Sequence, residues 1–195
     1  MTTLELPVPA EAGFQQAHET LMRSLAPRRV YYAWTDAPFG KVFLARTERG
    51  VCRVSFRRTE EDLVDDLEKR ELLPARAHDE LDPVFRQLEE YFEGKRRRFQ
   101  LPVDLRGVTP FQRKVLEAAS GIPFGEVARY TDVAGRIGHP KAQRAVGNAL
   151  GKNPVAIVIP CHRVVASGGR LGGYTGGLDI KRTLMAIESI QAKEN

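Results

Sequence analysis

Short apolar runs alternate with turn residues between positions 30 and 56 of the sequence. The runs Val30–Trp34, Lys41–Arg46 and Val51–Phe56 are rich in aromatic and β-branched residues, with turn residues around Gly40 and Gly50 between them. This pattern is typical of short strands joined by tight turns, so it predicts an antiparallel meander.

Apolar residues then recur at helical spacing in two segments. The first segment begins at Thr59, has Asp62 three residues later and carries leucines four residues apart. The second covers residues 79–93, with a stripe of leucine and phenylalanine that ends at Gly94. The spacing predicts two helices, and residues 99–105 are expected to add a last strand.

The second half of the chain has a different pattern, dominated by helix signals. Thr109 and Pro110 form a helix start, with Thr as the N-cap and Pro at the first helical position. Two short helices are expected at about 131–137 and 140–150, around a turn that contains Gly138, and a final helix begins near Asp179. Two short helices around a glycine-containing turn are typical of a helix-turn-helix.

The second helix of this pair has two distinct faces. Arg144 falls on one side together with Gly147 and Gly151. An interior helical glycine costs about 1 kcal/mol relative to alanine, so these glycines suggest close approach of a partner. The opposite side is apolar and is expected to face the core through Ala142, Ala145, Val146, Ala149 and Leu150.

These elements predict an α/β (α+β) fold in three parts. Residues 1–29 form an extension with a short amphipathic helix on Phe14, Ala17, Leu21 and Leu25, and no function is assigned to it. Residues 30–106 form an N-terminal domain with an antiparallel sheet and helices. Residues 107–195 form a mostly helical domain similar to a winged helix-turn-helix.

Charge and cysteine content bear on the kind of partner and on the cellular compartment. The 195 residues carry a net charge of +5, and the part from residue 109 onward has 12 Lys and Arg against 6 Asp and Glu. A basic domain favours an anionic partner such as nucleic acid, although a solvated surface gives the same count. Two cysteines far apart in the sequence indicate no disulfide framework. The N-terminus does not resemble a secretory signal and no apolar run has membrane-spanning length, so we expect a cytoplasmic protein.

The candidate chemistry lies at the end of an apolar run. Residues 154–159 have the length and composition of a buried strand, and Pro160 then leads into Cys161, His162 and Arg163. Most buried cysteines are inert. A cysteine beside histidine and arginine, however, lies where a thiolate is favoured, and the thiolate is the nucleophile.

A glutamate on the final helix has two interpretations. Glu188 falls within the apolar side of that helix, near Leu184. Burying an unpaired charge is expensive, so Glu188 either reaches water at the helix edge or pairs with His162. Residues 167–177 are rich in glycine and are expected to form a mobile wall near a ligand.

The motif Ile159-Pro160-Cys161-His162-Arg163-Val164 resembles the active-site signature of the O6-alkylguanine-DNA alkyltransferases. The resemblance covers residues 109–188 closely and residues 30–105 loosely. It implies direct reversal of DNA damage, in which O6-alkylguanine is flipped out of duplex DNA and its alkyl group moves irreversibly to Cys161. Each molecule would react once, with no cofactor and no metal.

The resemblance also implies roles for single residues. The catalytic set would be the acceptor Cys161, the base His162, the orienting Glu188 and the bracing Asn153. The DNA contacts would come from Arg144, Tyr130, Thr131 and Ser167, with Arg144 inserted where the flipped nucleotide was. The substrate pocket would be formed by Tyr130, Val164, Tyr174 and Thr175.

The implied partner is double-stranded DNA that contains O6-alkylguanine. The protein would bind this DNA as a monomer, with or without cooperativity between molecules, and would not associate with a membrane. A tryptophan common in the family is Leu116 here, which affects local packing. Two alternatives remain: a non-catalytic lesion-binding protein, which would lack Cys161, and a cysteine hydrolase, which would turn substrate over.

Overall fold

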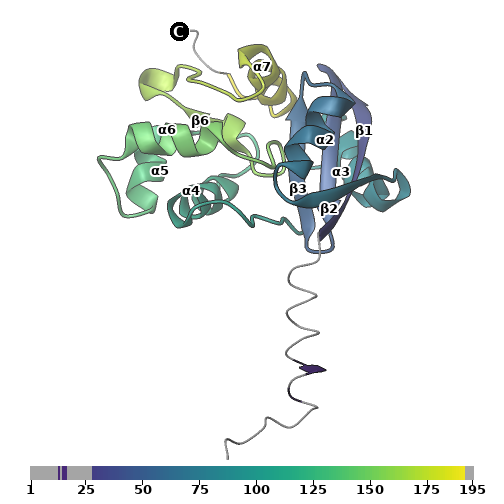
Figure 1. Cartoon of the computed structure of the whole chain (residues 1–195). Coiled ribbons are helices and arrows are strands. Elements are labelled where there is room, and N and C mark those ends of the chain that lie inside the picture. The colour runs from purple at the N-terminus through teal and green to yellow at the C-terminus, as the bar shows by residue number, and fades with distance from the viewer. Residues whose placement is uncertain (1–12, 14, 17–27, 192–195) are drawn as a thin grey trace, which may run out of the picture.

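The computed structural model describes residues 13, 15, 16 and 28–191 (Figure 1). The helix predicted on Phe14, Ala17, Leu21 and Leu25 lies outside the described residues. Within the described part of the chain, no helix is long and apolar enough to cross a membrane.

A four-stranded sheet forms the N-terminal half. Strands β1 (Arg28–Ala37), β2 (Gly40–Thr47) and β3 (Gly50–Phe56) form the predicted antiparallel meander. The structure adds β4 (Leu72–Arg76), which pairs with β1 in parallel and gives the order β3-β2-β1-β4. The sequence pattern did not predict β4, because a five-residue run interrupted by proline gives no clear strand signal.

Helices cover both faces of this sheet (Figure 1). Helix α2 (Glu60–Glu68) has the predicted start, with Thr59 and Asp62 in a capping box, and packs Leu63 and Leu67 on one face. A short 3₁₀ turn, η1 (Asp79–Leu81), leads into α3 (Asp82–Phe92) against the other face. Alternate strand residues face opposite ways, so one sheet can bury two helices.

The C-terminal half is mostly helical and lies beside the sheet (Figure 1). Helix α4 (Pro110–Ser120) starts as predicted, with the Thr109 hydroxyl accepting from the Gln112 backbone N–H. Helices α5 (Tyr130–Arg136) and α6 (Gln143–Gly151) form the helix-turn-helix, and α7 (Leu178–Ile187) closes the fold. A two-stranded parallel pair, β5 (Ala128–Arg129) and β6 (Val164–Val165), connects α5 to the segment after Cys161.

Three local predictions are wrong. Residues 99–105 form no strand and contribute one bridge, between Val103 and Val51. Residues 154–159 are buried apart from the half-buried Val158, but they form turns in which Ile157 has a φ of 73°. An apolar run signals burial without fixing the backbone conformation. Helix α6 begins at Gln143, and Ala145 is exposed where the spacing placed it in the core.

Candidate active site

Cys161 lies in a buried turn held by an asparagine side chain. The turn η2 (Cys161–Arg163) follows Pro160, and Cys161 is only 5% exposed. The Asn153 amide nitrogen donates to Cys161 Sγ at 3.2 Å and to the Ile159 carbonyl at 2.9 Å, and its oxygen accepts from the Val155 N–H. Asn153 therefore braces the turn and presents a donor to the sulfur.

The environment of the thiol differs from the prediction. Burial raises the pKa of Cys161, while the hydrogen bond from Asn153 and the nearby charge of Lys181 lower it. The sequence placed Arg163 as a cation that favours the thiolate. Instead its guanidinium faces Glu188 and the Ile122 carbonyl. The free protein therefore holds a protonated thiol that needs a base.

His162 is buried and forms the predicted pair with Glu188. Its Nε2 lies 2.7 Å from Glu188 Oε1, and both side chains are fully enclosed. Burial lowers the pKa of His162 despite the hydrogen bond to Glu188, so the ring is neutral near pH 7. Since Nε2 donates to the carboxylate, Nδ1 is the unprotonated nitrogen, and it has no hydrogen-bond partner among the described residues.

Glu188 is an ionised carboxylate at the C-cap of α7. Burial alone would raise its pKa, but hydrogen bonds from His162 and Arg163 hold it at about 2. Oε2 accepts from Arg163 Nε at 2.8 Å and from the Gly125 N–H at 3.2 Å. Oε1 accepts from Tyr91 at 2.7 Å, besides His162. These donors compensate the buried charge.

Three residues of this network were not assigned such a place from the sequence. Arg163 pairs with Glu188, Tyr91 reaches Glu188 from α3, and Lys181 is fully buried, with its ammonium bonded to the carbonyls of Val164 and Leu171. A buried glutamate beside a histidine requires a counter-charge, so the arginine next to His162 could have been inferred. Tyr91 lies 97 positions from Glu188, and no sequence signal connects them.

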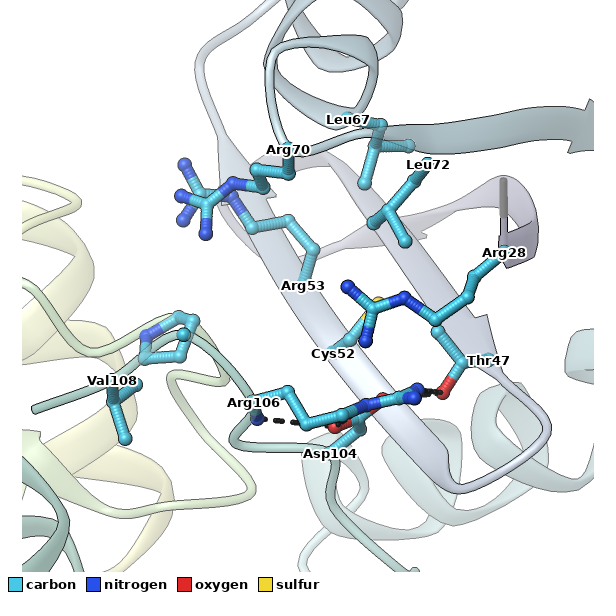
Figure 2. Close-up of a pocket in the computed structure, with 12 residues that line it drawn as sticks. Arg28, Thr47, Cys52, Arg53, Leu67, Arg70, Leu72, Asp104, Arg106 and Val108 are labelled. Carbon is cyan, nitrogen blue, oxygen red and sulfur yellow. Dashed lines mark hydrogen bonds and ion pairs between the residues drawn. The ribbon is translucent and has the colours of Figure 1, made fainter. Parts of the chain in front are cut away.

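The second cysteine has a different environment. Cys52 is half-buried at a cavity of about 280 Å³ between the sheet and the C-terminal half, with Arg28 and Arg106 nearby (Figure 2). Its Sγ–H donates to the Ala45 carbonyl, and burial raises its pKa to about 12. A carbonyl acceptor stabilises the thiol, whereas the amide donor at Cys161 stabilises the thiolate. The hydrogen bond at Cys161 therefore favours the thiolate, and the one at Cys52 favours the thiol.

Two predicted pocket residues, Tyr174 and Thr175, belong to the glycine-rich segment 167–177, and Tyr130 contacts that segment. The Tyr130 hydroxyl lies 3.5 Å from the Gly173 carbonyl, and the Thr175 hydroxyl donates to the Gly151 carbonyl at 2.8 Å. The Tyr174 hydroxyl is buried without a partner among the described residues. Gly172 has a φ of 64°, and a Cβ there would lie 2.8 Å from the Tyr130 hydroxyl, so only glycine fits this approach.

The predicted DNA contacts lie apart from the buried cluster. Arg144 and Ser167 are exposed, and Thr131 is half-buried at the start of α5. Val164 is fully buried in β6, where its carbonyl accepts from Lys181 at 2.6 Å. Gly147 faces the Tyr130 ring, whereas Gly151 has open space beside it. The structure thus brings together Cys161, His162, Glu188 and Asn153, and leaves Arg144, Thr131 and Ser167 outside that cluster.

The fold and the cluster together define an α/β protein in which a helix-turn-helix adjoins a cysteine nucleophile held by a polar network. The family model described as 6-O-methylguanine DNA methyltransferase, DNA binding domain, matches residues 110–190. The model of the ribonuclease-like domain of the same methyltransferase matches residues 30–105. The chain belongs to the 6-O-methylguanine DNA methyltransferase family.

Named relatives agree in sequence and in structure. The constitutive methylated-DNA–protein-cysteine methyltransferase of Bacillus subtilis (strain 168) is 40% identical over 165 residues, which is 84% of this chain and 98% of the relative. The crystal structure of the O6-methylguanine methyltransferase of Mycobacterium tuberculosis has a TM-score of 0.69 at 38% identity, covering 82% of this chain and 92% of that one. A structure of Mycobacterium tuberculosis OGT in complex with DNA has a TM-score of 0.70 at 36% identity, covering 81% and 92%.

Proposed function

We propose that this protein repairs DNA by moving the alkyl group of O6-alkylguanine onto Cys161. The observation that carries the proposal is the arrangement at the sulfur. Asn153 donates to Cys161, and the adjacent His162 is a neutral base oriented by an ionised Glu188. This is the arrangement of nucleophile, base and orienting group that activates a thiol.

The transfer is a single displacement. His162 Nδ1 takes the thiol proton, through a water as the family resemblance implies, and the sulfur attacks the alkyl carbon. The S–C bond forms as the O6–C bond breaks, the bonding pair leaves with guanine, and the proton ends on guanine. Burial raises the pKa of Tyr130, so its hydroxyl stays protonated and can donate to the leaving base.

The thioether product explains a single turnover. An alkyl thioether is stable to hydrolysis, because a thiolate is a poor leaving group from a saturated carbon. Each molecule therefore reacts once. No metal or cofactor enters the proposed step.

The DNA complex rests on the basic C-terminal half. The exposed Arg144 on α6 fills the gap left by the flipped nucleotide, and Tyr130, Thr131 and Ser167 also contact the DNA. Flipping costs a few kcal/mol, which an inserted side chain offsets by holding the gap open. Tyr130, Val164, Tyr174 and Thr175 form the pocket for the extruded base.

The proposal includes an organisation of the chain. Residues 30–106 form one domain and residues 107–195 the DNA-binding and alkyl-acceptor domain, with residues 1–29 as an extension whose last two residues, Arg28 and Arg29, begin β1. The protein acts as a monomer, one molecule per lesion. Because Cys161 must stay a reduced thiol, a reducing compartment such as the cytoplasm fits the function.

Intact mass measurement after incubation with duplex DNA containing O6-methylguanine tests the proposal. We expect one added methyl group per molecule, located on the peptide that carries Cys161, and no further reaction. Cys161→Ser should bind the DNA without transfer, and Cys52→Ser, the matched control, should react like the wild type. Continued product release after every molecule has reacted would indicate a turning-over hydrolase and would overturn the proposal.

A further inference from the structure

The N-terminal domain contributes one hydroxyl group to the network around Glu188. Tyr91 lies in the last turn of α3 and is 1% exposed. Its hydroxyl lies 2.7 Å from Glu188 Oε1, the same oxygen that His162 Nε2 approaches at 2.7 Å. The hydroxyl also lies 3.4 Å from His162 Nε2. Arg163 Nη2 donates to the same oxygen at 3.0 Å, so three donors converge on one carboxylate oxygen.

The hydrogen-bond direction is fixed by the charges. Glu188 is ionised and can only accept, so the tyrosine donates. Burial and the neighbouring Glu188 raise the pKa of Tyr91, so the hydroxyl keeps its proton. The ring is held in place by contacts with Phe92, Phe99 and Phe124, at centroid distances of 5.7, 5.3 and 6.2 Å.

We propose that Tyr91 is a positioning residue for the alkyl transfer, whose hydroxyl fixes Glu188 and through it orients His162. Tyr91 does not touch the sulfur in any described contact, so it acts through Glu188. The inference rests on the proposed function, since it concerns the base of that reaction. It assigns the N-terminal domain an indirect part, through Glu188, in the chemistry of the C-terminal one.

The proton affinity of His162 depends on how Glu188 shares its charge. The charged and titratable groups around the His162 imidazole are Glu188 and Lys181 from the α7 segment, Arg163 from η2 and Tyr91 from α3. Without the tyrosine hydroxyl, Oε1 loses one donor and its charge acts more strongly on His162. The protonated imidazole is then favoured, and the neutral base is present only at higher pH.

Single-turnover transfer from O6-methylguanine in duplex DNA, measured from about pH 5 to about pH 9, tests the inference with Tyr91→Phe. The ring packing is preserved, so the variant should fold. We expect the acidic limb of the rate profile to move to higher pH and the plateau rate to fall about tenfold, the effect of losing one hydrogen bond to a charged group. The affinity for DNA should stay unchanged.

Tyr32→Phe is the matched control, because the Tyr32 hydroxyl donates to Glu60 at 3.0 Å in the same domain. It should leave both the rate and the pH profile as in the wild type. An unchanged profile in Tyr91→Phe, or an equal shift in both variants, would overturn the positioning role. If the wild type itself transferred nothing, the proposed function would fail instead, so the two failures are distinguishable.

Discussion

The amide nitrogen of Asn153 donates a hydrogen bond to the sulfur of Cys161 across 3.2 Å, inside the turn that Asn153 itself braces. A donor aimed at sulfur stabilises the thiolate, and it is fixed before any substrate arrives. The same side chain holds the Ile159 carbonyl, so the geometry of the turn and the reactivity of the thiol depend on one residue.

Asn153→Ala should slow alkyl transfer about tenfold near neutral pH and move the rise of the rate with pH upward, because the thiolate loses a donor. Single-turnover rates over a pH series measure this. Gln112→Ala is the control: Gln112 Nε2 donates to the Lys152 carbonyl beside the same turn and does not contact the sulfur. If both variants behaved alike, the effect would come from the turn and not from the hydrogen bond to Cys161.

Glu188→Gln should slow transfer by about a hundredfold while duplex DNA is still bound, because His162 loses the charged partner that orients it. Transfer kinetics and a binding titration with methylated duplex measure the two properties separately. Glu117→Gln changes an exposed glutamate on α4 and should leave both unchanged. A transfer rate for Glu188→Gln equal to that of the wild type would exclude the orienting role.

The stability contributed by Glu188 should disappear in acid. Its pKa in the folded protein is about 2, below the ordinary 4.5, so the folded state favours the ionised form. The contribution, on the order of 3 kcal/mol, is present above about pH 4.5 and is lost as the pH falls towards 2. The difference in free energy of unfolding between the wild type and Glu188→Gln, from denaturant titrations, should therefore shrink on acidification. A constant difference would contradict the depressed pKa.

Arg144→Ala should weaken repair of duplex DNA about tenfold to a hundredfold, with little effect on reaction with the free O6-alkylguanine base. The reason is that an inserted side chain stabilises only the flipped state. Parallel rate measurements on the two substrates test this, with Arg86→Ala, an exposed arginine of α3, as the control. Equal losses on both substrates would point to misfolding.

Local signals predicted much of the fold because they depend on neighbours in the chain. Thr59 with Asp62, and Thr109 with Pro110, marked helix starts that the structure reproduces. The position of Glu188 on an apolar helix side left two outcomes open, contact with water at the helix edge or a pair with His162, and the structure has the pair. Capping and periodicity act over a few residues, so the sequence by itself determines them.

Long-range packing determined the rest. Residues 154–159 have the composition of a strand, yet they form turns before Cys161. The Asn153 side chain accepts from the Val155 N–H there, and Ile157 has a positive φ. Arg163 was predicted near the sulfur of Cys161, but it pairs with Glu188, because the buried carboxylate is the stronger partner for a guanidinium. Tyr91 joined the site only because α3 packs against the C-terminal half, across 97 positions of sequence. The sequence alone determined which groups are present and how each segment begins, whereas the tertiary structure decided which groups meet, because burial makes each charge select its partners in space.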